Sequence, residues 1–109
     1  MANIRVMVKR PGEEPEVKEI ENDWKIFKEL IGGGTLEGVY LGKGLWMYDD
    51  DEGKLKGLPY NFNLGLYDFA VGSIVFFRND YGEEEQSLTD KDIEFLKERL
   101  AYGYVPISR

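Results

Sequence analysis

The sequence predicts a compact α+β fold: an antiparallel sheet with two helices packed on one face of it. Apolar and polar residues alternate over 3–9 and 16–20, which is typical of strands in an antiparallel sheet, and a further strand is expected over 35–40. Apolar residues recur at helical spacing in two further segments, 23–31 and one that begins after Thr89.

Length and charge indicate a single domain. The chain has 109 residues, and its charges are spread evenly, with no linker, internal repeat or low-complexity block. We therefore expect one domain over residues 1–109, in which residues 103–109 form a short C-terminal tail.

The composition excludes several classes of function. The chain has no cysteine and no histidine, so it has no disulfide, no thiolate or imidazole zinc site and no Ser-His-Asp triad. Its 14 basic and 21 acidic residues give a net charge of −7, which argues against direct binding to a nucleic-acid backbone. No apolar stretch is long enough for a signal sequence or a membrane span, so we expect a cytoplasmic protein without a membrane partner.

Turn residues divide the first third of the chain. Pro11-Gly12 joins two alternating segments into a hairpin. Asn22 is the expected N-cap of the helix at 23–31, which ends at Gly32-Gly33-Gly34. The triple glycine is not a phosphate-binding loop, because such a loop lies between a strand and a following helix, and here the order is reversed.

The middle of the chain combines a second hairpin with a long loop. Residues 35–40 and 45–48 are expected to be strands joined by a turn at 42–44. The acidic segment 49–53 is predicted to be a solvated turn, since it lacks the acids that a calcium loop needs at its fifth and twelfth positions. Residues 54–66 are predicted to be an irregular loop that is either functional or wrapped over the core.

The last third ends in a helix. Residues 69–77 lack alternation, which predicts one strand buried on both faces. A turn at 79–82 and a polar edge strand at 83–85 follow. Thr89 is the expected N-cap of the second helix, which ends at Gly103. Its apolar stripe consists of Ile93, Leu96 and Leu100 and is widened by Phe95.

Aromatic residues are the main candidates for a binding site. Tyrosine and tryptophan provide rigid flat surfaces with a polar group, which suits base stacking and protein contacts alike. The side chains expected to stack on a ligand are Tyr40, Trp46, Tyr48, Tyr60 and Phe62. The side chains expected to bind a phosphate group of the ligand are Lys54, Lys56 and Arg78. Asn61 either contacts the same ligand or ties down a turn.

A carboxylate-based enzyme is a third class to consider. Without histidine and cysteine, such an enzyme would rely on carboxylates, tyrosine or lysine. Asp49, Asp51 and Asp68 are the candidates, but no diagnostic spacing pairs them as an acid and a base. We therefore expect no enzyme activity, no catalytic residue, no cofactor and no metal.

Several segments resemble the family known as domain of unknown function 3846. They are Pro11–Ile20 followed by Asn22, Leu30–Gly33, Glu52–Asn61, Val71-Gly72 and Ser87–Asp90. The resemblance reaches to about Leu100 and so covers nearly the whole chain. It implies a domain encoded by phages, plasmids or other mobile elements, or by the bacteria that carry them, and it implies no particular activity.

One position departs from the family pattern. The resemblance implies a motif Gly-Leu-Pro-x-Asn-Arg, which Gly57, Leu58, Pro59 and Asn61 match, whereas Phe62 stands where arginine is usual. Phenylalanine can stack on a ligand, but it cannot form a bidentate salt bridge. Any contact that the arginine makes with an anion or an acidic partner is therefore lost in this chain.

Two functions fit these features. The first is non-catalytic sequestration, by a phage or mobile-element protein, of a nucleotide-derived signal of host defence. With a net charge of −7, such a small-molecule site needs a local basic pocket. The alternative is an inhibitor or adaptor whose acidic segments, 13–16, 49–52 and 83–85, steer it to a basic surface of a host protein. Edge strands also allow a homo-oligomer.

Overall fold

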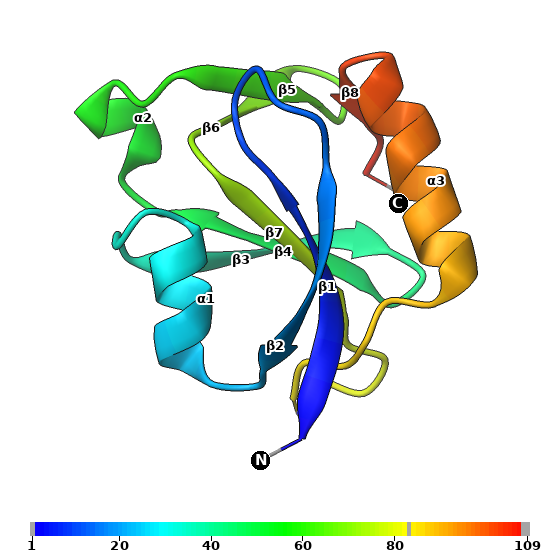
Figure 1. Cartoon of the computed structure of the whole chain (residues 1–109). Coiled ribbons are helices and arrows are strands. Elements are labelled where there is room, and N and C mark those ends of the chain that lie inside the picture. Colours follow the sequence, from blue (N-terminus) through cyan, green and yellow to red (C-terminus); the bar gives the residue numbers. More distant parts are fainter. Residues whose placement is uncertain (1, 83, 108–109) are drawn as a thin grey trace.

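A five-stranded sheet runs through the centre of the computed structural model, which describes residues 2–82 and 84–107 (Figure 1). The strand order is β2-β1-β7-β4-β3, and all neighbouring strands are antiparallel. The strands are β1 (Asn3–Lys9), β2 (Glu16–Glu21), β3 (Leu36–Gly42), β4 (Leu45–Asp50) and β7 (Ile74–Arg78).

A second, smaller sheet has the order β6-β5-β8. It consists of β5 (Tyr60–Leu64), β6 (Asp68–Val71) and β8 (Tyr104–Val105), and β8 pairs with β5 in parallel. Residues 104–105 are therefore part of the fold rather than of a free tail. The helices are α1 (Trp24–Leu30), α2 (Gly53–Lys56) and α3 (Asp90–Ala101).

The large sheet separates two hydrophobic cores. In β7, Ile74 and Phe76 belong to one core, whereas Val75 and Phe77 belong to the other, because successive side chains of a strand point to opposite faces. The first core includes Phe62 of the small sheet and Leu96 and Leu100 of α3; the second includes Phe27 and Ile31.

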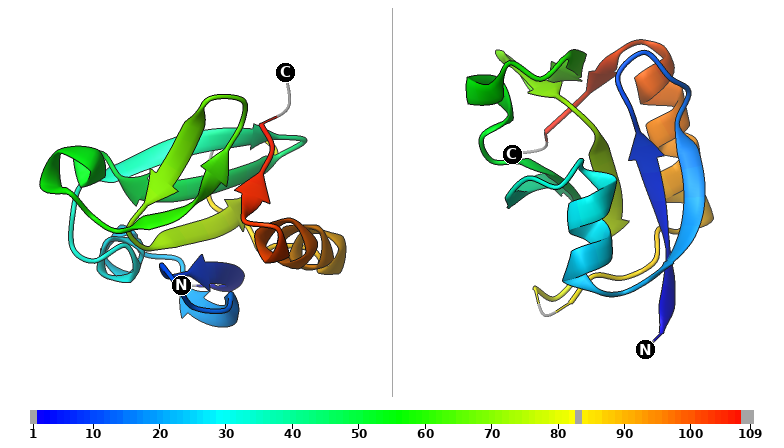
Figure 2. Two further views of the ribbon diagram at one scale, coloured as in Figure 1. Left: turned by 90° about the horizontal axis from the view of Figure 1, so that it is seen from above. Right: turned by 60° about the vertical axis from the view of Figure 1, so that its left-hand side comes forward.

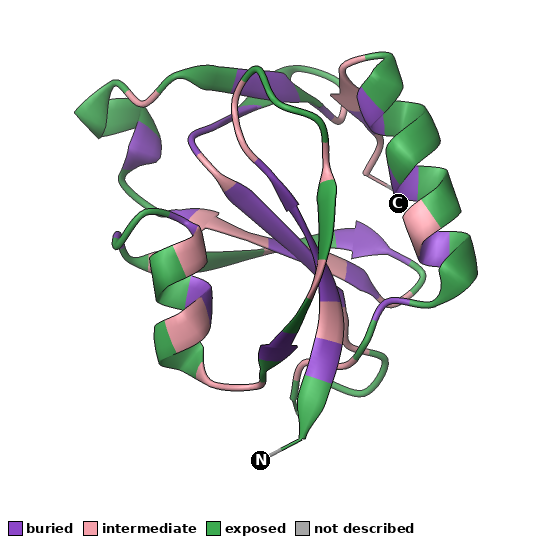
Figure 3. Cartoon of the chain, viewed as in Figure 1, coloured by how far each residue is buried: buried purple, intermediate pink, exposed green. Residues whose placement is uncertain are grey.

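The two long helices thus cover opposite faces of the large sheet, as Figures 1 and 2 show. The α+β class and the antiparallel sheet are confirmed, but the prediction that both helices pack on one face is wrong. The physical reason is that central strand β7, which is buried along most of its length (Figure 3), carries apolar side chains on both faces, so each face needs a cover.

Side-chain caps fix where α1 and α3 begin. Thr89 Oγ1 accepts a hydrogen bond from Asp92 N at 3.1 Å, and Asp92 Oδ2 accepts one from Thr89 N at 2.8 Å, so α3 begins with a capping box. In α1 the cap is Asp23, whose Oδ1 accepts from Lys25 N at 3.0 Å. The predicted cap, Asn22, instead donates to the carbonyl oxygen of Glu85 at 3.1 Å.

The segment predicted as a long irregular loop is mostly regular. It contains most of α2 and the whole of β5, and the preceding acidic segment 49–53 is divided between the end of β4, a turn and the start of α2. The predicted strand at 69–77 is also two strands, β6 and β7, in different sheets. Gly72 divides them with φ +71°, and a Cβ placed on it would lie 2.8 Å from Leu58 Cδ1.

The predicted edge strand at 83–85 does not form in the described part of that segment. Glu83 lies outside the described residues, and residues 84 and 85 are not in a strand. Gln86 makes an isolated antiparallel bridge with Arg78. Within the described residues, no helix has the length and apolar character that a membrane crossing requires.

Candidate anion-binding pocket

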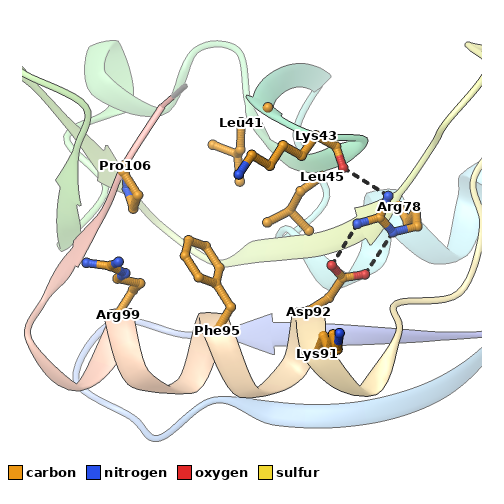
Figure 4. A pocket seen from close by; sticks show the side chains of 10 residues that line it. Leu41, Lys43, Leu45, Arg78, Lys91, Asp92, Phe95, Arg99 and Pro106 are labelled. Atoms are coloured by element: carbon orange, nitrogen blue, oxygen red, sulfur yellow. Dashed lines mark hydrogen bonds and ion pairs between the residues drawn. The ribbon is translucent and has the colours of Figure 1, made fainter. Parts of the chain in front are cut away.

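A pocket of about 410 Å³ lies between α3 and the turn that joins β3 to β4 (Figure 4). We call it the α3 pocket. Leu41, Leu45 and Pro106 give it apolar walls. Its charged and aromatic lining consists of Lys43, Arg78, Lys91, Asp92, Phe95 and Arg99. The volume is in the range of small-molecule sites, and the lining carries four cations and one carboxylate.

Arg78, at the end of β7, connects the two walls of the pocket. Its Nε and Nη2 donate to the two carboxylate oxygens of Asp92 at 2.9 and 2.8 Å. Its Nη1 donates to the carbonyl oxygen of Lys43 at 2.9 Å and to Asp80 Oδ1 at 2.6 Å. The guanidinium thus ties α3 to the β3–β4 turn, and most of its donors are used within the protein.

Asp92 is held as an anion by this contact. Burial raises the pKa of Asp92, but the hydrogen bonds from Arg78 and Thr89 outweigh burial and bring the pKa below its usual range. The Asp92 charge is consequently offset by Arg78, and the remaining lining charges of the pocket are positive.

Lys43 occupies a conformation that non-glycine residues rarely adopt. Its φ is +54°, and within residues 2–82 and 84–107 it is the single non-glycine residue with a positive φ. This left-handed conformation costs about 1–2 kcal/mol. The hydrogen bond from Arg78 to the Lys43 carbonyl oxygen holds the turn in place. Strain of this kind is often found at binding sites.

Three cations of the pocket remain available. Lys43, Lys91 and Arg99 form no ion pair with any described residue. The Arg99 guanidinium lies over the Phe95 ring, 5.2 Å from its centroid, and Phe95 is 36% exposed. Unpaired cations around an exposed ring can bind an anion by charge-assisted hydrogen bonds and stack a planar group. Asp92 is committed to Arg78 and Thr89, so its carboxylate is not free to act as a base.

An acidic cleft of about 300 Å³ lies where the outer edges of β3 and β6 meet. Its charged and aromatic lining includes Glu37, Asp49, Asp51, Lys54, Asp68 and Phe69. Lys54 pairs with Asp68 at 2.5 Å and lies 4.5 Å from the centroid of the Phe69 ring. Within the described residues, no group of three or more carboxylates is arranged to hold a metal ion.

Asp49 is the unusual group of this cleft. It is the direct cross-strand partner of Glu37, and its Oδ1 is buried without a hydrogen-bond partner in the described part of the chain. Burial first, and the facing carboxyl group of Glu37 second, raise the pKa of Asp49 to about 8. Asp49 is therefore largely protonated at neutral pH. The sequence had offered Asp49, Asp51 and Asp68 as carboxylate candidates, and the structure brings all three to this cleft.

The aromatic residues predicted on the β3–β4 hairpin are not among the residues that line the α3 pocket. Trp46 and Tyr48 pack against the core under α1. Tyr48 donates its hydroxyl hydrogen to Glu85 Oε2 at 2.5 Å, and burial, followed by this bond, raises the pKa of Tyr48 above its usual range. Tyr40 is 47% exposed, and its ring lies 5.0 Å from that of Trp46. Its hydroxyl accepts a hydrogen bond from Gly44 N at 3.2 Å.

The lysines predicted to meet a phosphate are already paired with acids. Lys54 pairs with Asp68, as described above, and Lys56 Nζ lies 2.6 Å from Asp50 Oδ2. Tyr60 is 54% exposed beside Phe69, on the small sheet. Arg78 is the one predicted ligand residue among those that line the α3 pocket, where it joins the walls.

Asn61 and Phe62 are core residues, which corrects their assignment to a ligand site. Phe62 is fully buried and stacks on Phe76, so it has no ring face for a ligand. Asn61 is buried; its Nδ2 donates to the carbonyl oxygens of Lys9 and Gly72, both at 2.8 Å. Its Oδ1 accepts from Lys9 Nζ at 3.1 Å. Asn61 lies in β5 and not in the expected turn, but its side chain ties down the backbone of neighbouring segments.

Sequence reasoning did not select Lys43, Lys91, Phe95 and Arg99 as site residues. A signal for three of them was present, because Lys91, Phe95 and Arg99 recur every fourth residue and share one face of α3. Lys43 is brought to that face by tertiary contacts of the β3–β4 turn with Arg78 and Asn79.

Comparison with protein families supports the resemblance seen in the sequence. The model of the family described as domain of unknown function (DUF3846) matches residues 4–101. The chain belongs to this family. Comparison with curated proteins and with solved structures gave no match. The matched range includes every residue of the α3 pocket named above except Pro106. The family description names no function, so a functional argument has to come from the pocket itself.

Proposed function

We propose that this DUF3846 protein binds a small anionic, nucleotide-like ligand in the α3 pocket without transforming it. The observation that supports this most directly is the set of three cations around the exposed Phe95 ring, Lys43, Lys91 and Arg99, which form no ion pair with any described residue. In a chain of net charge −7, such a cluster is a local basic pocket of the kind that an anionic ligand needs.

The chemistry of the lining favours binding over catalysis. Its carboxylate, Asp92, is consumed by Arg78 and Thr89, and the lining holds no thiol, imidazole or hydroxyl nucleophile. In the setting of a mobile element, such a protein would sequester a nucleotide-derived signal of host defence and so lower its free concentration.

Calorimetric titration and thermal unfolding with a panel of linear and cyclic nucleotides test the proposal. A bound nucleotide at 100-fold excess over its Kd should stabilise the fold by about 2.7 kcal/mol. The combined substitution Lys43→Gln, Lys91→Gln and Arg99→Gln should abolish this stabilisation. Lys97→Gln is the matched control, since Lys97 is exposed on α3 but does not line the pocket. A flat response across the panel by the folded natural protein would refute the proposal.

A second candidate function is the docking of a basic protein segment on the acidic cleft. The outer edges of β3 and β6 are not paired with other strands of the described chain, and an unpaired edge can accept an extended peptide. Tyr60 and Phe69 add exposed aromatic surface beside the acidic side chains. This arrangement supports the role of an inhibitor or adaptor with a basic partner.

Retention of partner proteins from host lysate tests the second candidate. A docked basic protein should be retained at low salt and released at high salt. Its retention should be lost when Glu37→Gln, Asp51→Asn and Asp68→Asn are combined, and kept by the triple variant of the α3 pocket. Equal retention by both triple variants would contradict docking on the acidic cleft.

A further inference from the structure

The α3 pocket has cations at two separated ends. Lys91 and Arg99 lie eight positions apart on α3, which places their Cα atoms about 12 Å apart along the helix axis. Phe95 stands midway between them on the same face. Figure 4 shows Arg99 directed toward Pro106 at one end of the pocket, and Lys91 beside Asp92 and Arg78 at the other.

The two ends differ in how their cation is held. At the first end, the Arg99 guanidinium is kept next to the Phe95 ring by a cation–π contact at 5.2 Å. At the second end, Arg78 donates to Asp92, Asp80 and the Lys43 carbonyl oxygen, whereas Lys91 forms no ion pair with a described residue. Lys43 extends from the opposite wall toward Phe95 (Figure 4).

The arrangement offers places for two anionic groups. The Arg99 guanidinium is held against the Phe95 ring, whereas Lys91 projects from the helix about two turns away, so an anion bound at Arg99 leaves Lys91 available for a charge-assisted hydrogen bond to a second anionic group. A planar group stacked near Phe95, with an anionic group on either side, would contact both ends and Lys43 at once.

We propose that the ligand of the α3 pocket carries two separate anionic groups on either side of a planar base, as a dinucleotide does. This inference rests on the proposed function. It narrows the expected ligands from anionic nucleotides in general to nucleotides that carry two separate phosphate groups. A ligand of this class gains affinity from having both groups on one molecule, because the second contact is intramolecular.

Calorimetric titrations with matched nucleotides test the inference. The probes are adenosine and guanosine monophosphate and the linear dinucleotides pApA and pGpG. For at least one base, the dinucleotide should bind about tenfold or more tightly than the monophosphate, since one additional charge-assisted contact contributes on that order. Lys91→Gln and Arg99→Gln should each weaken dinucleotide binding by about tenfold, whereas only one of the two should weaken binding of the monophosphate.

The outcomes separate this inference from the proposed function. Equal affinities for monophosphates and dinucleotides, or equal losses for both ligands in both variants, would overturn the two-anion ligand while leaving nucleotide binding in place. No binding of any of the four probes by the folded natural protein would overturn the inference and, if the wider panel also gave no response, the proposed function as well. Lys97→Gln should leave all four affinities unchanged.

Discussion

Two half-exposed phenylalanine rings, each with a cation over it, lie in opposite electrostatic surroundings. In the α3 pocket, the Arg99 guanidinium lies 5.2 Å from the Phe95 centroid; in the acidic cleft, Lys54 Nζ lies 4.5 Å from that of Phe69. Lys54 is also bonded to Asp68, whereas Arg99 has no carboxylate partner among the described residues.

The difference shows why the local pairing of charges matters more than their total. The protein carries −7 overall, yet the α3 pocket presents unpaired cations because its carboxylate is neutralised by Arg78. In the acidic cleft the cation is neutralised and the carboxyl groups are in excess. The same cation–ring pair is therefore suited to an anion at one site and to a basic group at the other.

The largest difference between the two sites should appear when each cation–carboxylate pair is broken. Arg78→Met leaves Asp92 buried without its partner, so it should lower the free energy of unfolding by about 3 kcal/mol. Lys54→Met leaves the exposed Asp68 and should change it by less than about 1 kcal/mol. Chemical denaturation of both variants measures the contrast. Equal losses would show that Arg78 does not join the pocket walls.

Truncation of the two rings should separate the sites by ligand. Phe95→Ala should weaken binding of a nucleotide to the α3 pocket about tenfold, because stacking on an aromatic ring contributes roughly 1–3 kcal/mol per base. Phe69→Ala should leave nucleotide affinity unchanged, and it is a matched control because Phe69 is exposed to a similar extent, 42% against 36%. Calorimetric titration of both variants tests this. If Phe69→Ala had the larger effect, the ligand would lie in the acidic cleft.

Local signals explain what could be predicted of the fold. Turn residues such as Pro11-Gly12 and the Thr89 cap act over a few positions, and the hairpins and helices that depend on them form as expected. β5 was missed because Asn61 and Asn63, ordinary turn formers, obscured the alternation of its apolar residues. The buried hydrogen bonds of Asn61 depend on tertiary contacts that no local pattern contains.

The candidate site was less predictable because its parts serve two roles. Phe95 fits the apolar stripe of α3 as well as it fits a binding surface, and helical spacing alone does not decide between them. Phe62 was selected for its aromatic ring, yet it is wholly buried. The opposite wall, with Lys43, depends on a hydrogen bond across 35 positions of the chain.

The strained turn should show a trade-off that the acidic cleft lacks. A residue with a side chain is strained in the left-handed backbone conformation, and Lys43→Gly removes this strain. The substitution should therefore raise the free energy of unfolding by about 1 kcal/mol while it weakens nucleotide binding. Lys56→Gly, on α2 beside the other site, should lower stability, since glycine is unfavourable in a helix. Denaturation and titration of the same samples measure both effects. A loss of stability in Lys43→Gly would show that the lysine side chain supports the fold.

The last effect depends on pH and concerns the proton on Asp49. The folded protein keeps this proton up to a pKa of about 8, far above the usual value of 3.8, so between these values the folded state binds more protons than the unfolded state. The stability contributed by Asp49 is therefore complete below about pH 4 and is lost as pH rises through about 8. Asp49→Asn should remove this decline and, at alkaline pH, stabilise the fold, because it relieves the burial and the repulsion of a carboxylate that faces Glu37. Asp51→Asn, an exposed neighbour, is the control, and a decline with pH that persists in Asp49→Asn would assign the proton elsewhere. Nucleotide affinity at the α3 pocket should be the same in both variants, because neither residue lines it.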